Sequence, residues 1–176
     1  MTAGPHAFGT RVFTTGTPET VYRLLAEATS WKDWAGPLVT RARWEVEPDD
    51  SGAGGIRRLG RPPFMVREEI TAAHPPHHHG YRLLSGQPVR SYRAEVQISP
   101  VAGFRADAGP SSPGTAADAD PGTLIEWTGT AVPLVPGTGP LVRLLLGRMV
   151  HGFAMRLAAA AQPPEGHSAR RPRRGR

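Results

Sequence analysis

Glu68 is the residue of this sequence best suited to acid–base chemistry. It lies between Val66 and Ile70, and the period of two in this segment places its carboxyl group on the apolar face of a strand. A carboxyl group that faces an apolar cavity has a raised pKa and can act as an acid, a base or a ligand anchor. Hydration at a cavity mouth and pairing with an arginine are the alternatives. Glu68 is therefore the best candidate for a catalytic residue.

Four histidines stand close together, at His74, His77, His78 and His79. Imidazole is the commonest neutral metal ligand, so the cluster suggests a metal site. In an extended segment, however, His78 points away from its two neighbours, and no carboxylate lies nearby in the sequence. We therefore expect no metal here and interpret the histidines as a solvated turn that enters a strand.

Two tyrosines fall on apolar strand faces, Tyr81 with Leu83 and Tyr92 with Ala94. Their hydroxyl groups could orient a carbonyl or a phenol of a ligand. The alternative is that both are core aromatics whose hydroxyls reach the rim of the core. The same two interpretations apply to tryptophans in neighbouring strands. The candidate ligand-binding residues are Trp44, Val66, Glu68, Tyr81, Leu83, Tyr92, Ala94, Trp127, Met149 and Phe153.

Several other chemistries are excluded by what the sequence lacks. It has no cysteine, so thiol nucleophiles, thiolate metal sites and disulfides are ruled out. No Gly-x-Ser-x-Gly motif is present, and no helix follows the Gly52–Gly55 cluster as a phosphate loop would need. Asp118 and Asp120 lack the spacing of a calcium loop. We expect no cofactor.

Helix signals are clear near the N-terminus. Thr17 is a typical N-cap, Pro18 suits the first helical position, and apolar residues follow at helical spacing to Ala28. A second short helical turn is predicted from Ser30 to Trp34, and Gly36-Pro37 should end it. These two short helices follow a first strand at Phe8–Thr15.

From Val39 onward the apolar period changes to two, which indicates strands. Ala42, Trp44 and Val46 mark the inner face of one strand, and short turns separate those that follow. Together with Phe8–Thr15 they make seven strands, so the sheet should be antiparallel. The other predicted strands are Gly55–Arg61, Phe64–Ala72 with Phe64, Val66, Ile70 and Ala72 inward, His79–Ser85, Ser91–Ser99 and Thr123–Val132.

A long amphipathic helix is predicted at Thr138–Ala161. It needs a broad apolar surface, and a curved sheet with a cavity beneath the helix is the obvious candidate. Arg143 and His151 lie on the opposite, solvated arc. The residues of its predicted apolar arc are Val142, Leu145, Leu146, Met149, Val150, Phe153, Leu157 and Ala160.

Charge and composition set the domain boundaries. The 176 residues suit one domain, at 1–161, with a flexible insertion at Ala106–Gly122 that is poor in apolar residues. The net charge is +6, but five arginines and one glutamate beyond Ala161 account for four of those charges. We therefore expect a disordered basic tail at Gln162–Arg176 and no specific nucleic-acid face on the body. Without a signal peptide or spanning segment, the expected location is cytoplasmic.

The sequence resembles the START-like superfamily, the polyketide cyclase and lipid-transfer group with a helix-grip fold. The resemblance rests on the Thr17–Val21 helix start, the Trp31 and Trp34 pair and the strand around Trp127. It also includes the run from Pro75-Pro76 through Tyr81–Gly86 and Pro88–Tyr92. It implies an α+β fold in which a seven-stranded antiparallel sheet curls around the long C-terminal helix.

The resemblance implies a function without fixing an activity. The first hypothesis is the binding or transport of a hydrophobic small molecule, lipid or polyketide-like, in the internal cavity. A second is a polyketide aromatase/cyclase that catalyses aldol cyclisation and dehydration. A third is weak association with a membrane or an anionic polymer through the basic tail. Neither the ligand nor the oligomeric state follows from these residues.

Overall fold

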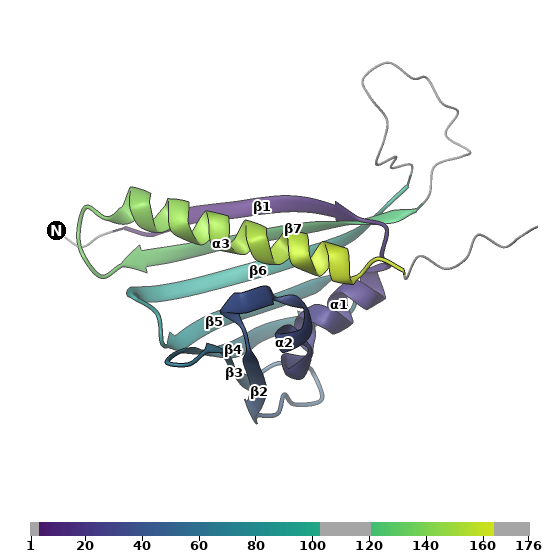
Figure 1. Cartoon of the computed structure of the whole chain (residues 1–176), viewed down its shortest axis with the longest axis horizontal. Coiled ribbons are helices and arrows are strands. Elements are labelled where there is room, and N and C mark those ends of the chain that lie inside the picture. The colour runs from purple at the N-terminus through teal and green to yellow at the C-terminus, as the bar shows by residue number, and fades with distance from the viewer. Residues whose placement is uncertain (1–3, 103–120, 164–176) are drawn as a thin grey trace, which may run out of the picture.

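The structure is a computed structural model that describes residues 4–102 and 121–163. Its strands are β1 (His6–Thr14), β2 (Arg41–Val46), β3 (Ile56–Arg61), β4 (Phe64–His74), β5 (His78–Ser85), β6 (Val89–Val101) and β7 (Gly122–Pro133). Over the described residues they form one seven-stranded sheet in the order β1-β7-β6-β5-β4-β3-β2 (Figure 1). Every neighbouring pair is antiparallel, which confirms the predicted sheet.

Two short helices follow β1. They are α1 (Pro18–Ala26) and α2 (Trp31–Trp34), with 3-10 turns at Ala28–Ser30 and Gly36–Leu38. The predicted cap is present, because the Thr17 hydroxyl accepts a hydrogen bond from the Thr20 amide at 3.3 Å. α2 ends at Trp34, as the Gly36-Pro37 signal predicted, and those two residues belong to the second 3-10 turn. The predicted pair of short helices is confirmed.

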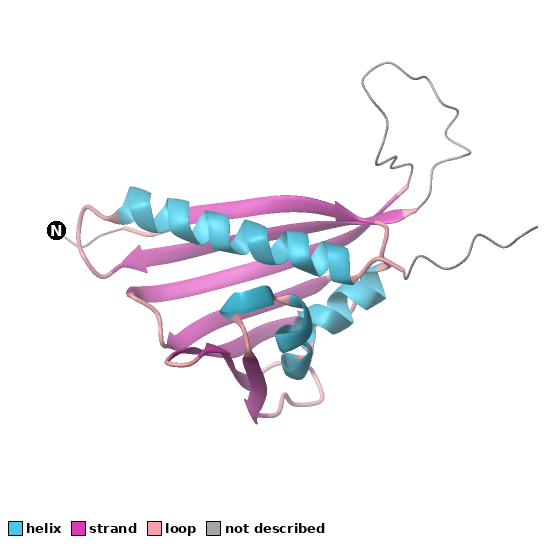
Figure 2. Ribbon diagram, viewed as in Figure 1, coloured by secondary structure: helices cyan, strands magenta, loops and turns pink. Residues whose placement is uncertain are grey.

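The long helix α3 (Gly139–Ala160) lies along one face of the sheet (Figure 2). It packs mainly against β1 and β7, and α1 and α2 also contact it. The sheet, the long helix and the two short helices together form the helix-grip arrangement. A single apolar core runs between them, with Trp31, Trp127 and Leu157 among its largest fully buried side chains.

The predicted apolar arc of α3 is fully buried only in the C-terminal half of the helix, whereas Val142, Leu146 and Met149 pack against the core while partly buried. Val150, Phe153 and Leu157 are buried, whereas Leu145 is 57% exposed. Ala160 is also exposed, because the helix turns Ala154 and Ala158 into the core in its place. The N-terminal half extends beyond the fully packed core and covers a cavity instead.

The C-terminal end of α3 is joined to β1 by a buried hydrogen bond, because the Thr14 hydroxyl donates to the Ala158 carbonyl at 2.7 Å. A second buried bond, from the Thr123 hydroxyl to the Gly16 carbonyl at 2.6 Å, joins β7 to the residues that follow β1. A side chain at Gly16 would collide with the Ala161 carbonyl, so this close approach requires glycine. The Thr14 bond and the close packing at Gly16 hold this end of the helix, while its other end lies over the cavity.

A β-bulge shifts the inner face of β4. The register changes between Ile70 and Ala72, so Ala73 rather than Ala72 packs against the core. Two other residues predicted to face inward are largely exposed: Val46, beside a register shift in β2, and Phe64, at the start of β4. The register shifts accompany the loss of strict alternation at Val46 and Ala72, whereas Phe64 is exposed although it lies on the side of the cavity.

Some expectations lie outside the described residues. These are the disorder of the tail at 162–176, of which only 162 and 163 are described, and most of the insertion at 106–122. The end of that insertion is corrected, because Gly122 already pairs with Val101 as the first residue of β7. Among the described helices, none is long and apolar enough to cross a membrane.

Candidate functional site

A cavity of about 310 Å³ lies between the sheet and the N-terminal half of α3. The helix contributes Val142, Leu145, Leu146, Met149 and Phe153 to its wall. Apolar residues from β3 to β6 and from the segment before β2 line the rest. Most of the wall is therefore hydrocarbon, which suits an apolar ligand.

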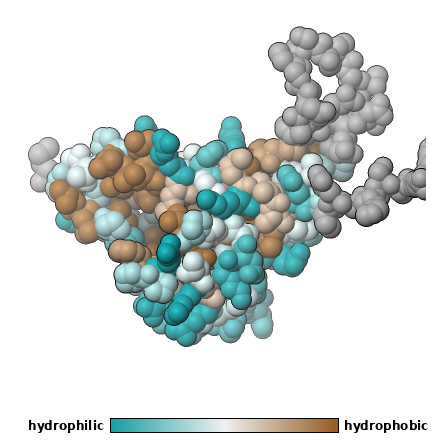
Figure 3. Space-filling view, viewed as in Figure 1, coloured by the Kyte–Doolittle hydropathy of each residue, from teal (hydrophilic) through white to brown (hydrophobic). Residues whose placement is uncertain are grey.

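The cavity has a mouth built from exposed apolar side chains. Leu38, Phe64 and Leu145 all line the cavity, and they are 54%, 82% and 57% exposed. Figure 3 shows apolar side chains gathered over the N-terminal half of α3, whereas the region around β2 and β3 is mostly polar. Large apolar side chains that line a cavity and also reach solvent mark the opening through which a ligand can enter.

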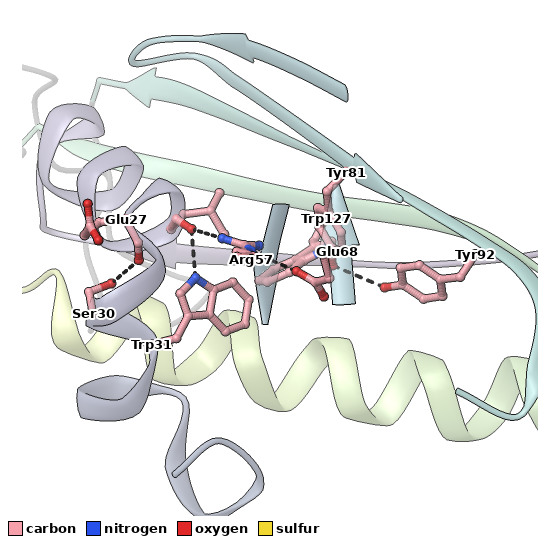
Figure 4. Close-up of polar contacts among 9 residues, drawn as sticks. Glu27, Ser30, Trp31, Arg57, Glu68, Tyr81, Tyr92 and Trp127 are labelled. Atoms are coloured by element: carbon pink, nitrogen blue, oxygen red, sulfur yellow. Dashed lines mark hydrogen bonds and ion pairs between the residues drawn. The ribbon is translucent and has the colours of Figure 1, made fainter. Parts of the chain in front are cut away.

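Among the described residues, one charged side chain reaches the cavity wall, that of Glu68 from β4. Its Oε2 accepts a hydrogen bond from Nε of Arg57 in β3 at 2.8 Å, and the two side chains are 7% and 0% exposed (Figure 4). The pairing follows from the sheet, because Arg57 and Glu68 are directly opposite each other in the β3–β4 register. The structure therefore agrees with the expectation that the Glu68 carboxylate lies on an apolar face. It also agrees with the alternative that an arginine pairs with this carboxylate.

The guanidinium of Arg57 is held on several sides. Its Nη1 donates to the Leu25 carbonyl at 2.8 Å, in the last turn of α1, where the helix dipole favours a cation. Its Cζ lies 4.5 Å from the ring centroid of Trp31 and 5.5 Å from that of Tyr81. The Trp31 indole donates to the same Leu25 carbonyl at 2.9 Å. Arg57 thus sits under the cavity and does not line it.

Burial and charge act on Glu68 in opposite directions. Burial raises the pKa of Glu68 above its usual value, and the adjacent Arg57 guanidinium offsets part of that rise. Because a guanidinium keeps its proton in proteins, loss of the carboxylate charge would leave a buried cation without a counter-ion. We therefore treat Glu68 as ionised at neutral pH.

A hydrogen-bonded aromatic cluster adjoins Glu68. The Trp127 indole donates to the Tyr81 hydroxyl at 3.2 Å, and the Tyr81 and Tyr92 hydroxyls are 3.3 Å apart (Figure 4). Burial, and more weakly the charge of Glu68, raise the pKa of both tyrosines. Both phenols are thus neutral at physiological pH and can donate or accept a hydrogen bond at the cavity wall.

Most of the predicted ligand-binding residues meet at this cavity. Those that line it are Val66, Glu68, Tyr81, Leu83, Tyr92, Met149 and Phe153. Trp127 and Ala94 are fully buried behind the wall, and the indole of Trp127 lies edge-on to Tyr81. Trp44 lies elsewhere, in a shallow groove beside Tyr22 and His79. Trp44, in the edge strand β2, thus lies outside the residues that line this cavity.

Sequence reasoning missed Arg57. Its signal was present, since Arg57 and Leu59 share one face of a strand with period two, and Leu59 is buried. An arginine on an apolar face predicts a buried counter-charge. Naming Glu68 as its partner needed the register of β3 against β4.

The histidine cluster is not a solvated turn throughout. His79 is buried, and within the described residues neither ring nitrogen has a hydrogen-bond partner. Burial and the charge of Arg57 lower the pKa of His79 to about 3. The side chain of the preceding residue, His78, is on the opposite face of β5. Its Nε2 forms a hydrogen bond with Glu95 Oε2 at 2.7 Å, and its Nδ1 lies 3.4 Å from that of His74. No group of residues among those described could hold a metal ion.

The fold agrees with comparisons to known proteins. Residues 6–162 match the family model described as polyketide cyclase/dehydrase and lipid transport. No curated protein matches the sequence.

Solved structures share the fold at low sequence identity. A START superfamily protein from Mycobacterium smegmatis is 16% identical, with a TM-score of 0.68 over 89% of this chain and 97% of that one. The XoxI protein from Bacillus cereus is 20% identical, with a TM-score of 0.63 over 88% of this chain and 94% of that one. The di-domain ARO/CYC BexL from the BE-7585A biosynthetic pathway is 15% identical, with a TM-score of 0.66, and the match covers 91% of this chain and 51% of BexL.

Proposed function

This chain belongs to the polyketide cyclase/dehydrase and lipid transport family, and we propose that it binds a hydrophobic small molecule in the cavity beneath α3. The observation that carries the proposal is an apolar cavity with an apolar mouth and one polar wall. Burial of a ligand against hydrocarbon supplies affinity, and a few polar groups fix its orientation.

The size of the cavity limits the ligand. Its volume of about 310 Å³ lies at the lower end of the range of roughly 300–1,000 Å³ typical of ligand pockets. A compact ring system or a short chain fits this volume. A larger ligand requires α3 to move outward at its N-terminal half, which packs less tightly than its C-terminal half.

The binding proposal can be tested by filling the cavity. Met149 lines the cavity and Met155 lies on the exposed side of the same helix. We expect Met149→Trp to weaken binding of the apolar dye N-phenyl-1-naphthylamine by about tenfold or more, since it displaces the ligand volume. Met155→Trp is the matched control and should bind as the parent does. Equal binding by both variants would place the dye outside this cavity.

Native mass spectrometry of the purified protein complements the dye assay. A co-purified apolar molecule that is present in the parent and reduced in Met149→Trp supports the proposal. The same molecule retained at full level in that variant argues against this cavity as its site.

A second candidate function is aldol cyclisation and dehydration of a poly-β-keto chain. It is favoured by the presence of Glu68 beside the Tyr81 and Tyr92 hydroxyls in one cavity. The carboxylate could remove a proton from a methylene group while a phenol hydrogen-bonds to the carbonyl that becomes the enolate. For a cyclase, Glu68→Gln should abolish turnover with binding largely retained, whereas for a carrier it should change affinity alone.

A further inference from the structure

Two acceptor oxygens at the cavity wall lack a hydrogen-bond donor among the described residues. Glu68 uses Oε2 for Arg57, and within the described residues no hydrogen bond reaches its Oε1. Gln87, in the turn between β5 and β6, also lines the cavity, and its Oε1 is buried without a partner among the described residues. A buried acceptor without a donor is costly, so a ligand that donates hydrogen bonds gains more here than one that only accepts.

The cation near the cavity lies behind the wall and does not line it. Arg57 has no exposed surface and donates through Nε to Glu68 and through Nη1 to the Leu25 carbonyl, while its Nη2 is buried without a partner among the described residues. A ligand inside the cavity therefore meets the carboxylate of Glu68 before it meets the guanidinium. In a medium of low dielectric constant, a second negative charge at this place is strongly repelled.

From this arrangement we infer that the cavity selects a neutral ligand with a hydroxyl group over the matching carboxylate, and that Glu68 determines this selectivity. The inference rests on the proposed binding function and narrows its ligand class. A hydroxyl group donates a charge-assisted hydrogen bond to Glu68 Oε1, and charge-assisted bonds are among the stronger ones. Of the Tyr81 and Tyr92 phenols, the one whose hydrogen is not used in the bond between them can then donate to the oxygen of the same hydroxyl.

Three probes with one ring system separate binding from selectivity. Naphthalene, 2-naphthol and 2-naphthoate have the same apolar body and differ in the polar group. Equilibrium dialysis of the full chain at pH 7.5 should show that 2-naphthol binds about tenfold or more tightly than 2-naphthoate, with naphthalene between them.

Variants assign the selectivity to Glu68. Glu68→Gln removes the negative charge and should reduce the naphthol-to-naphthoate ratio towards one. Glu69→Gln is the matched control, because Glu69 is the next residue of β4, points to the other face and pairs with Arg82. It should keep the ratio of the parent.

A double variant covers the case in which Glu68→Gln fails to fold with an unpaired Arg57. Arg57→Met with Glu68→Met removes both charges at similar volume, which proteins often tolerate. It should bind naphthalene and lose the discrimination between naphthol and naphthoate.

The outcomes distinguish failure of the proposed binding function from failure of the selectivity for a hydroxyl group. If none of the three probes binds, the proposed function fails and the selectivity fails with it. If naphthalene and naphthoate bind the parent as well as naphthol does, the binding function stands and the selectivity is overturned. A ratio that persists in the double variant overturns the role of Glu68 alone.

Discussion

Arg57 and Glu68 stand directly opposite each other on β3 and β4, and their side chains meet at 2.8 Å with almost no solvent contact. The pair lies beneath the cavity, with the carboxylate at the wall and the guanidinium behind it. Since each ion is desolvated, each depends on the other, and removing one differs from removing both.

Removal of Arg57 alone should therefore be strongly destabilising. We expect Arg57→Met to lower the free energy of unfolding by about 3–5 kcal/mol, because it leaves a buried carboxylate unpaired. The double variant Arg57→Met with Glu68→Met should recover most of this loss. Urea unfolding of the parent and both variants measures it. A double variant less stable than Arg57→Met would contradict this prediction. It would show that the Arg57–Glu68 pair stabilises the fold beyond the mutual neutralisation of two buried charges.

His79 should make stability depend on pH. Its native pKa of about 3 lies below the usual value near 6.5, so on acidification the unfolded chain takes up a proton that the folded chain does not. The contribution of His79 to the free energy of unfolding is fully present above pH 6.5. It is lost, by up to about 1.4 kcal/mol per pH unit, as the pH falls towards 3.

Urea unfolding at several pH values between 6.5 and 5, where most carboxyl groups stay ionised, measures this effect. His79→Phe keeps an aromatic ring without a titrating group, so its stability should fall less steeply with acid than that of the parent. His151→Ala, at an exposed site of α3, should keep the steeper parental slope. Equal slopes in the parent and His79→Phe would contradict the prediction.

The two tyrosines of the cavity wall should differ in what their hydroxyls contribute. Tyr81→Phe leaves the buried Trp127 indole without its acceptor, which we expect to cost about 1–3 kcal/mol of unfolding free energy. Tyr92→Phe removes one partner of Tyr81 and leaves the bond from Trp127 intact, so it should cost less. Thermal and urea unfolding compare them. A larger loss in Tyr92→Phe would rule out the Trp127 bond as the main contribution.

The two halves of α3 should respond differently to truncation. Leu157→Ala removes a fully buried side chain and should cost about 2–5 kcal/mol, whereas Leu145→Ala at the exposed cavity mouth should cost less than about 1 kcal/mol. Leu145→Ala should instead weaken binding of N-phenyl-1-naphthylamine. Urea unfolding and dye titration of both variants test this. Similar stability losses would show that the mouth of the cavity closes over Leu145.

Local patterns in the sequence predicted the elements well. Alternation indicated all seven strands, Thr17 and Pro18 marked the start of α1, and the helical period from Val142 to Leu157 identified α3. These signals succeed because periodicity and capping depend on neighbours a few residues apart. They also placed Glu68 on an apolar face, where the structure has it.

The periodic pattern of a strand or helix mispredicts which side chains are buried where the packing depends on other elements of the fold. The bulge in β4 shifts the inner face to Ala73, and the position of β2 at the edge of the sheet takes Trp44 away from the cavity. Half of the apolar arc of α3 covers a cavity, so Leu145 is exposed although its spacing resembles that of Leu157.

The sequence by itself thus determined the fold class, the order of its elements and the apolar face on which Glu68 lies. Only the tertiary structure decided that Arg57 is its partner, that His79 is buried, and which aromatic side chains reach the cavity. Side-chain direction along a strand repeats every two residues and is visible locally. The identity of the opposite residue depends on strand register and on helix packing, which join segments that are distant in the chain.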